Sequence, residues 1–481
     1  MKKTNLARTL ACLLATTILS ASGADWVSLF DGKTLNGWKA SEKPGSFRVE
    51  QGMIAVEGPR SHLFFTGTEQ VKADFKNFEL ECEILTKPGA NSGVYFHTEY
   101  QENGFPQKGF EAQVSNTHIG EENYRELKKT GSLYGIRNVY KQLIKDEEWF
   151  KMHISVRGKR IQILLNDTLV VDYVEPSNPV FNPKQPGRRL SRGTFALQGH
   201  DPKSRTFFKN IRVQPLPDDL PDTDPVITFD AYEQRIVALA KDNFPVINFH
   251  THLKGGLTVD EVRAESRKTG IFNGIAVNCG LNFAVTNDTG IEAYLKSMEG
   301  QPVFIGMQAE GREWVNLFSP AARAKFDYVF TDAMTVVDDS GKRMRLWIKE
   351  EVGEIPDAEA FMKMLVSRTV TILSTEPIDI YVNPTYLPAQ LAPQYDQLWT
   401  PERMQRVVDA AAKRGIAIEI NSRSKLPSAA FLKLAKQAGV KFTFGTNNTD
   451  KNIGRLDYCF QMVDELNLKW QDMWMPKPGT R

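Results

Sequence analysis

The sequence predicts a multi-domain protein in which an all-β sandwich is followed by a parallel α/β barrel. Three observations lead to this fold class. Short segments of alternating polar and apolar residues fill the chain up to Val213, a stretch rich in proline and aspartate runs from Gln214 to Asp224, and apolar strands alternate with amphipathic helices from Thr228 onward. The 481 residues suit two domains of about 200 to 250 residues each.

The start of the chain has the pattern of an export signal. Basic residues at Lys2, Lys3 and Arg8 precede the apolar run Leu10–Leu19, and small residues follow up to Ala24. The apolar run is too short to cross ~30 Å of hydrocarbon. We therefore expect residues 1–24 to be a cleaved signal peptide and the protein to be exported, either periplasmic or secreted, with no membrane anchor after cleavage.

Composition excludes several classes of function. The formal net charge is only +2, so nothing in the electrostatics favours binding to nucleic acid. After the signal only Cys82, Cys279 and Cys459 remain, an odd and sparse set that predicts buried thiols rather than a disulfide framework. No nucleotide or organic cofactor is indicated.

The first domain, expected over residues 25–216, consists of short strands. Phe78, Leu80, Cys82 and Ile84 alternate with glutamates, which predicts a strand with one buried and one solvated face. Asn166-Asp167 has the composition of a hairpin turn between two apolar segments. Further strands are predicted at Gly93–Thr98, Gly109–Ser115, Phe150–Arg157, Arg160–Leu165 and Gly193–Gln198.

A proline-stiffened linker at 217–227 leads to the second domain, expected over residues 228–481. Thr400-Pro401 and Gly415 are typical of the two ends of a helix. Helices are predicted at Val259–Arg267, Ala358–Ser367 and Glu402–Arg414. Seven strands are predicted, at Pro245–Phe249, Gly274–Val277, Pro302–Met307, Tyr328–Phe330, Ile378–Val382, Ile416–Ile420 and Phe442–Gly445.

Six ordered strings give the first domain a specific resemblance. They are SLFDGKTLNGW from Ser28, NSGVYFH from Asn91, GFEAQ from Gly109, TGSLYG from Thr130, GTFALQGH from Gly193 and FFKNIRV from Phe207. Together they resemble the 3-keto-disaccharide hydrolase family, a concanavalin-like jelly-roll sandwich. The resemblance implies an exported carbohydrate-active hydrolase or lyase acting on 3-keto-glycosides, with the 3-keto-sugar made by a separate oxidoreductase.

A ketone at C3 of a sugar acidifies the C2 proton, so a base can remove it and the C1 substituent can leave before water adds back. This route requires an acid, a base and a group that stabilises the enediolate. We expect Glu111 and His200 to transfer protons and Gln113 and Tyr134 to orient the sugar. The polar set on strand ends also includes His97 and Gln198. A divalent metal near His97 or His200 is an open alternative.

The second domain places polar residues where its strands end. His250 and His252 close the first strand, and alternation directs both imidazoles to one side, an arrangement that suits a metal in a barrel mouth. In α/β barrels this end of the strands forms the active site. The other strands end in Asn278, Gln308 and Glu310, Asp332, Asn383, Glu419 and Asn421, and Asn447.

The second domain resembles the polymerase and histidinol phosphatase (PHP) superfamily through FHTH, IDIYVNP, AIEIN and FTFGTNN. That family has a seven-stranded barrel and binds up to three metals. Here Asn278-Cys279-Gly280, Asn383 and Asn447 stand where it shows metal ligands, so the metal site is degenerate. We expect His250 and His252, with Glu310 or Asp332, to hold one divalent metal of unknown identity.

Alternatively, Asn383, Asn421 and Asn447 suit a neutral polyol such as a sugar. A rival hypothesis for the whole chain is a carbohydrate-binding module fused to a metal-dependent PHP-like hydrolase, a phosphoesterase or amidohydrolase.

Overall fold

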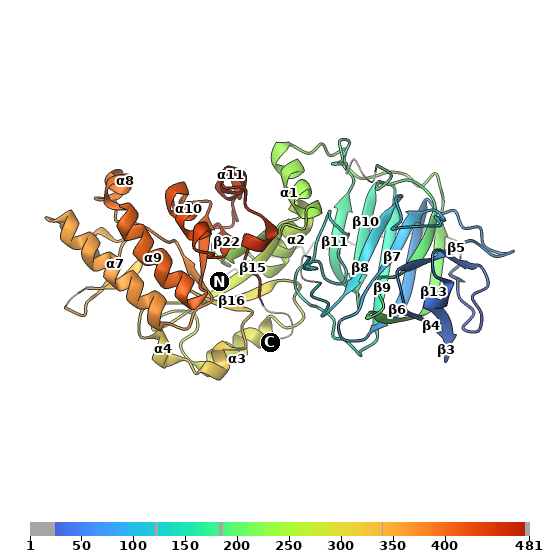
Figure 1. Cartoon of the computed structure of the whole chain (residues 1–481), viewed down its shortest axis with the longest axis horizontal. Helices are drawn as coiled ribbons and strands as arrows, with labels where there is room; N and C mark the ends of the chain where they lie inside the picture. The colour runs from blue at the N-terminus through green and yellow to red at the C-terminus, as the bar shows by residue number, and fades with distance from the viewer. Residues whose placement is uncertain (1–24, 121–123, 182–185, 339, 477–481) are drawn as a thin grey trace, which may run out of the picture.

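The computed structural model describes residues 25–120, 124–181, 186–338 and 340–476. The predicted signal peptide lies outside these residues. A sandwich and a barrel lie next to each other along the long axis, and helix α1 (Ala231–Lys241) lies where they meet (Figure 1). None of the helices that the described residues form combines the length and the hydropathy needed to cross a bilayer.

The predicted antiparallel sandwich is confirmed. One sheet has eight strands in the order β11-β10-β9-β6-β13-β4-β3, with β1 beside β13, and the other has five in the order β2-β5-β12-β7-β8. The predicted bounds of β9 and β10 match those observed. The strands are β1 Val27–Ser28, β2 Trp38–Ala40, β3 Phe47–Glu50, β4 Met53–Glu57, β5 Ser61–Phe65, β6 Asn77–Thr86, β7 Asn91–Thr98, β8 Phe110–Ser115, β9 Phe150–Arg157, β10 Arg160–Leu165, β11 Thr168–Val174, β12 Thr194–Gly199 and β13 Arg205–Leu216.

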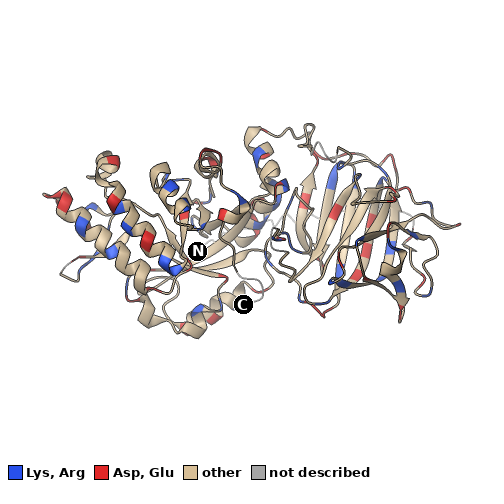
Figure 2. Ribbon diagram, in the orientation of Figure 1, with Lys and Arg blue, Asp and Glu red and all other residues tan. Residues whose placement is uncertain are grey.

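The glutamates of β6 face outward and meet bases on the neighbouring strands. Glu79 accepts from His153 at 2.7 Å and from Arg157 at 2.7 Å, and Glu81 pairs with Arg212 at 2.5 Å. Opposite charges directly across a sheet stabilise the pairing of strands. Basic and acidic residues are interspersed over both domains in the same way (Figure 2).

The predicted seven-stranded parallel barrel is also confirmed. Its strands close in the order β14-β15-β16-β17-β20-β21-β22, and Asn248 of β14 pairs with Phe444 of β22. A small hairpin of β18 (Thr335–Val337) and β19 (Arg343–Arg345), which the sequence did not predict, follows β17. The barrel strands are β14 Ile247–Thr251, β15 Phe272–Cys279, β16 Phe304–Ala309, β17 Tyr328–Asp332, β20 Ile380–Val382, β21 Ala417–Asn421 and β22 Phe442–Gly445.

Local sequence fixes the ends of the helices around the barrel. Thr400 accepts a hydrogen bond from Arg403 N at the start of α9, and Gly415 ends that helix with a φ of 66°. Asp230 and Glu233 form a capping box at α1. The remaining helices are α2 Val259–Thr269, α3 Asp288–Ser297, α4 Trp314–Leu317, α5 Pro320–Arg323, α6 Lys349–Val352, α7 Ala358–Thr375, α8 Tyr395–Leu398, α9 Pro401–Arg414, α10 Ala429–Gln437 and α11 Asp457–Glu465, with 3₁₀ turns at Pro44–Ser46, Ala392–Gln394 and Trp470–Asp472.

The sandwich packs against the amino-terminal end of the barrel. Leu127, Val139 and Tyr140 of the sandwich belong to the same apolar cluster as the aromatic residues inside the barrel, and the Tyr140 hydroxyl donates to Phe244 O at 3.2 Å. Parallel strands present their carboxyl ends at the opposite side. The two sets of polar residues predicted for the two domains therefore do not share one pocket.

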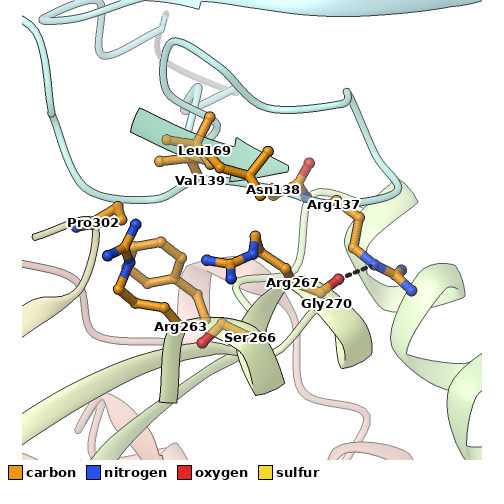
Figure 3. A pocket seen from close by; sticks show the side chains of 11 residues that line it. Arg137, Asn138, Val139, Leu169, Arg263, Ser266, Arg267, Gly270 and Pro302 are labelled. Atoms are coloured by element: carbon orange, nitrogen blue, oxygen red, sulfur yellow. Dashed lines mark hydrogen bonds between the residues drawn. The ribbon is translucent and has the colours of Figure 1, made fainter. Parts of the chain in front are cut away.

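The junction is close-packed around Arg137. Its Nε donates to Arg267 O at 2.9 Å (Figure 3), and its Nη2 donates to Lys268 O at 2.8 Å. Both bonds satisfy carbonyls in the last turn of α2. Gly270 ends α2 with a φ of 85°, and a Cβ there would lie 3.0 Å from Arg137 Nη1. The cavity beside these residues holds only about 20 Å³, room for about one water molecule.

Candidate active site

A cavity of about 340 Å³ lies over the five-stranded sheet of the sandwich. Its volume is typical of small-molecule sites. Strands β7, β8 and β12 form its floor, and segments outside the strands form its walls. The lining residues are Asn91, Tyr95, Phe105, Glu111, Gln113, Tyr124, Glu126, Tyr134, Arg188, Gln198 and His200. The structure thus brings together five of the six polar residues that the sequence nominated in this domain.

The floor depends on the register between β7 and β8. Tyr95 pairs with Glu111 and Gly93 with Gln113, and residues that pair across a sheet face the same side. A Cβ at Gly93 would lie 2.6 Å from Glu111 Oε1. Glycine in the NSG string therefore leaves the room that the Glu111 carboxyl occupies.

Glu111 is the buried acid of the cavity, with only 5% of its surface exposed. Gln198 Nε2 donates to Glu111 Oε1 at 3.1 Å and to the Tyr95 hydroxyl at 3.0 Å, and Arg188 Nη1 lies 3.6 Å from Glu111 Oε2. Burial raises the pKa of Glu111, although Arg188 and Tyr95 act in the opposite direction. A carboxyl with a raised pKa in a cavity is suited to exchange protons with a ligand.

Three further polar atoms in the cavity have no protein partner among the described residues. They are Gln113 Oε1, Gln198 Oε1 and Arg188 Nε, and each is buried. The amide nitrogen of Gln113 does have a partner, because Nε2 donates to Asn91 Oδ1 at 2.9 Å. Buried polar atoms are costly unless they are hydrogen-bonded. A ligand rich in hydroxyl groups would satisfy all three.

One side of the cavity is formed by Tyr124, Glu126 and Tyr134, which we call the tyrosine–glutamate wall. The Tyr124 hydroxyl donates to Glu126, and the Tyr134 hydroxyl lies 3.2 Å from Glu126 Oε2 and 2.9 Å from the Tyr124 hydroxyl. Burial is the main cause that raises the pKa of Tyr124 and of Tyr134, and the Glu126 charge adds to it. Both phenols therefore stay protonated and act as hydrogen-bond donors.

His200 lies at the rim of the cavity and is half-buried. Its Nδ1 lies 2.8 Å from Asp201 Oδ2, so the carboxylate fixes the orientation of the ring. A histidine oriented by a carboxylate is a common acid or base in enzymes. Its position fits the proton-transfer role that we predict for it.

His97 is the exception among the predicted residues, because it lies outside the cavity. It has a φ of 55°, and the pairing of β7 with β12 shifts register at this end of the strand. The alternation that runs through Gly93 and Tyr95 is interrupted there. The ring instead packs beside Phe78 and bonds Lys76 O at 2.8 Å, so His97 has a structural position.

Sequence reasoning missed several lining residues, chiefly Tyr95, Glu126 and Arg188. Tyr95 could have been found, because it alternates with Gly93 in the NSGVYFH strand. Glu126 and Arg188 lie outside the strands, so they belong to no alternating pattern of polar and apolar residues. They reach the cavity only through the path of their loops, which no local pattern encodes.

At the carboxyl end of the barrel, the structure groups the predicted residues only in part. His250 Nδ1 lies 2.6 Å from Glu419 Oε1, and Glu419 Oε2 accepts from Asn383 N at 2.7 Å. Asn421 Nδ2 donates to Asn383 Oδ1 at 3.1 Å, and Asn447 Nδ2 lies 3.5 Å from the same oxygen. Asn383 and Asn447 both have a φ of 47°, a conformation that asparagine tolerates better than most residues.

Two observations bear on a metal at this end. The Nε2 atoms of His250 and His252 are buried and have no hydrogen-bond partner among the described residues. The Nδ1 atoms are held by Glu419 and by Ala276 O, as in histidines that bind metals. However, the described residues contain no group of three or more His, Cys, Asp and Glu side chains arranged to hold an ion. The residues present therefore do not form a metal cluster, and we assign no chemical step to one.

Glu310 and Asp332 are engaged elsewhere in the barrel mouth. Glu310 Oε1 accepts from Asn278 Nδ2 at 2.5 Å and from Gln308 Nε2 at 3.0 Å, and Asp332 Oδ1 accepts from two backbone amides of the following turn. Burial raises the pKa of both carboxyls.

Comparison with known proteins finds a family match over the sandwich. Residues 25–214 match the model of the family described as the 3-keto-alpha-glucoside-1,2-lyase-like domain. The sandwich is similar to domains of this type. A 3-keto-disaccharide hydrolase of Bacteroides thetaiotaomicron is 35% identical over 83 residues, which make up 15% of this chain and 27% of that relative.

Solved structures are similar over about two fifths of the chain. A candidate glycosyl hydrolase from Parabacteroides distasonis has 22% identity and a TM-score of 0.34, covering 41% of this chain and 95% of its own. A carbohydrate-binding module from Bacillus subtilis has 16% identity and a TM-score of 0.23, covering 40% of this chain and 97% of its own.

Proposed function

We propose that the sandwich cleaves glycosides that already carry a ketone at C3, by elimination followed by addition of water. The observation that carries the proposal is a buried carboxyl, Glu111, with a raised pKa and an arginine at 3.6 Å in a cavity of the size of a small sugar. The family match over residues 25–214 supports the same chemistry.

In this mechanism ionised Glu111 takes the C2 proton of the keto-sugar, and the electron pair of that bond forms an enolate with the C3 ketone. Arg188 stabilises the negative oxygen. The enolate then expels the C1 substituent, whose oxygen takes a proton from His200. Water adds to C1 of the resulting double bond and gives a proton to His200, which restores it. Glu111, whose carboxyl proton exchanges with solvent, then protonates C2, so the sum is a hydrolysis.

The test is to incubate the full chain with a 3-keto-glycoside and with the same glycoside unoxidised, in ordinary water and in D₂O. We expect release of the aglycone from the 3-keto compound only, with deuterium incorporated at C2. Glu111→Gln should abolish release, whereas Glu99→Gln, at an exposed glutamate paired with Lys108, should not. Equal release from the unoxidised glycoside, or no deuterium at C2, would refute elimination.

A second candidate function rests on the Nε2 atoms of His250 and His252, which are both buried and make no hydrogen bond among the described residues. In this alternative the sandwich binds carbohydrate without cleaving it, and the barrel is a PHP-like hydrolase that uses a divalent metal. The Glu111→Gln variant separates the two, because a binding module would leave the activity of the whole chain unchanged.

A further inference from the structure

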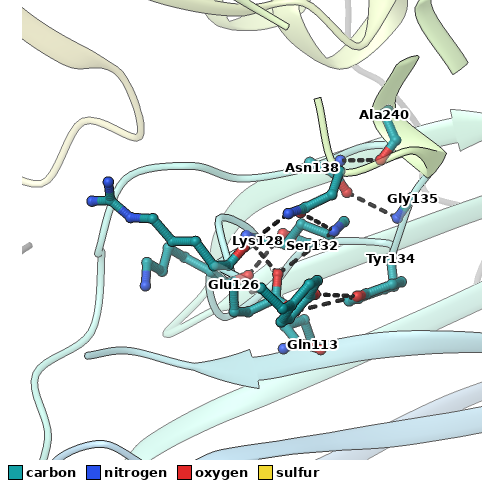
Figure 4. Close-up of polar contacts among 12 residues, drawn as sticks. Gln113, Glu126, Lys128, Ser132, Tyr134, Gly135, Asn138 and Ala240 are labelled. Atoms are coloured by element: carbon teal, nitrogen blue, oxygen red, sulfur yellow. Dashed lines mark hydrogen bonds and ion pairs between the residues drawn. The ribbon is translucent and has the colours of Figure 1, made fainter. Parts of the chain in front are cut away.

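The tyrosine–glutamate wall of the sandwich cavity is attached to the barrel domain through Asn243. Lys128 Nζ donates to Asn243 Oδ1 at 2.6 Å, and Asn243 Nδ2 donates to Arg125 O at 2.8 Å. Asn243 therefore holds the chain on both sides of Glu126. Figure 4 shows Glu126 and Lys128 beside Tyr134 of the cavity and Asn138, whose Nδ2 donates to Ala240 O near the end of α1.

The position of Asn243 is fixed by both domains. It follows α1, and Val237 of this helix belongs to the apolar core of the sandwich, whereas Ile236 and Leu239 belong to the core of the barrel. Two apolar faces on one helix leave it little freedom to shift. Asn243 itself has a φ of 60°, which sets the direction of its side chain.

Lys128 transmits that position to the wall. Its side chain is only 1% exposed, and its ammonium lies 3.6 Å from Glu126 Oε1 and 4.4 Å from the centre of the Tyr134 ring. A buried ammonium must be paired, so its location is determined by the acceptors around it. The Lys128 ammonium and the Lys128 backbone N, at 2.9 Å, both hold Glu126 Oε1. Glu126 Oε2 is thereby directed toward Tyr124 and Tyr134.

We propose that the barrel domain completes the sugar site of the sandwich, with Asn243 and Lys128 as positioning residues that act through Glu126 on the two tyrosines. The proposal rests on the function proposed above for the sandwich cavity. In this role the wall bonds hydroxyl groups of the sugar that take no part in the reaction, so its contacts hold the sugar equally in the ground state and the transition state. Loss of such contacts raises KM and leaves kcat unchanged.

The first arm of the test measures kinetics of the full chain with a 3-keto-glycoside. Asn243→Gly removes the side chain without strain, because glycine accepts a positive φ. We expect KM to rise about tenfold, the effect of losing one hydrogen bond to a charged group, with kcat within twofold of the wild type. Asn243→Asp keeps an oxygen for Lys128 and should restore most of the affinity.

The matched control is Lys141→Met. Lys141 also crosses the junction, donating to Val303 O at 2.9 Å and pairing with Asp327 at 2.8 Å, but it does not line the cavity. We expect its KM to be unchanged. A rise in KM in Lys141→Met equal to that in Asn243→Gly would overturn the proposal, since any loosening of the junction would then suffice.

The second arm does not require turnover. Amide hydrogen exchange of peptides covering Glu126–Tyr134 should accelerate in Asn243→Gly and not in Lys141→Met, and Glu126→Gln should remove the effect of Asn243→Gly on KM. If the wild type releases no aglycone, the proposed function fails while the exchange experiment still decides the positioning role. Unchanged exchange in Asn243→Gly, or additive effects on KM, would refute it.

Discussion

Gly93→Ala tests whether the position of the Glu111 carboxyl controls the chemistry. The new Cβ would lie 2.6 Å from Glu111 Oε1, whereas ordinary contact begins at about 3.4 Å, so the carboxyl must move by about 0.8 Å. A misplacement of about 1 Å costs on the order of 100-fold in rate. We expect kcat/KM for the 3-keto-glycoside to fall by that factor, and overpacking to cost about 1–3 kcal/mol of stability.

The assay compares kcat/KM and the melting temperature of Gly93→Ala with those of Gly45→Ala. Gly45 is a suitable control because a Cβ there would meet no atom within 4 Å and because its φ is not positive, so alanine fits the backbone without strain. We expect Gly45→Ala to keep full activity and at least its stability. Gly93→Ala with kcat/KM within twofold of the wild type, in a folded protein, would refute the assignment of Glu111 as the base.

Three other predictions follow from the same geometry. The base must be ionised to act, and burial raises the pKa of Glu111 above the ordinary glutamate value of 4.5. We therefore expect kcat/KM to increase with pH, with the midpoint of the increase above 4.5. A measured midpoint at or below that value would contradict this. His97→Gln should leave KM unchanged and lower the free energy of unfolding by about 1 kcal/mol, because the ring bonds backbone groups of Lys76 and Ser191 outside the cavity. Steady-state kinetics check KM, and a denaturant titration checks the stability. Because the described residues contain no group of three or more metal-ligating side chains, elemental analysis of the purified chain should find no stoichiometric divalent metal; a metal present in the wild type and lost in a His250→Ala, His252→Ala double variant would contradict this.

The sequence was most informative where one physical period dominates. Alternation of apolar residues with glutamates predicted β6, and the paired glutamates of its outer face are where the pattern put them. Capping chemistry located α9, because Thr400 and Pro401 act on the first turn of the helix and Gly415 acts on its last turn. The parallel rhythm predicted seven barrel strands, although it did not predict the β18–β19 hairpin, whose strands have only three residues each.

Part of the cavity could also be predicted from strings on the strands. Glu111 and Gln113 lie on β8 and Gln198 on β12, with β7 between these strands, and alternation directs all three side chains to one face. His97 shows the limit of this reasoning. One left-handed residue at the end of β7 interrupts the period, and the energy that decides such a bulge comes from the packing of its neighbours.

What the sequence by itself determined is the class of each domain and the floor of the first site, because both depend on periods of two or of 3.6 residues that every local segment repeats. Tertiary structure alone decided the rest. The contacts of Glu126 with Tyr134, of Glu111 with Arg188 and of Lys128 with Asn243 join residues between 8 and 115 positions apart in the chain. Buried charges find such partners only when the whole chain has folded, because desolvation makes each one costly until its partner arrives.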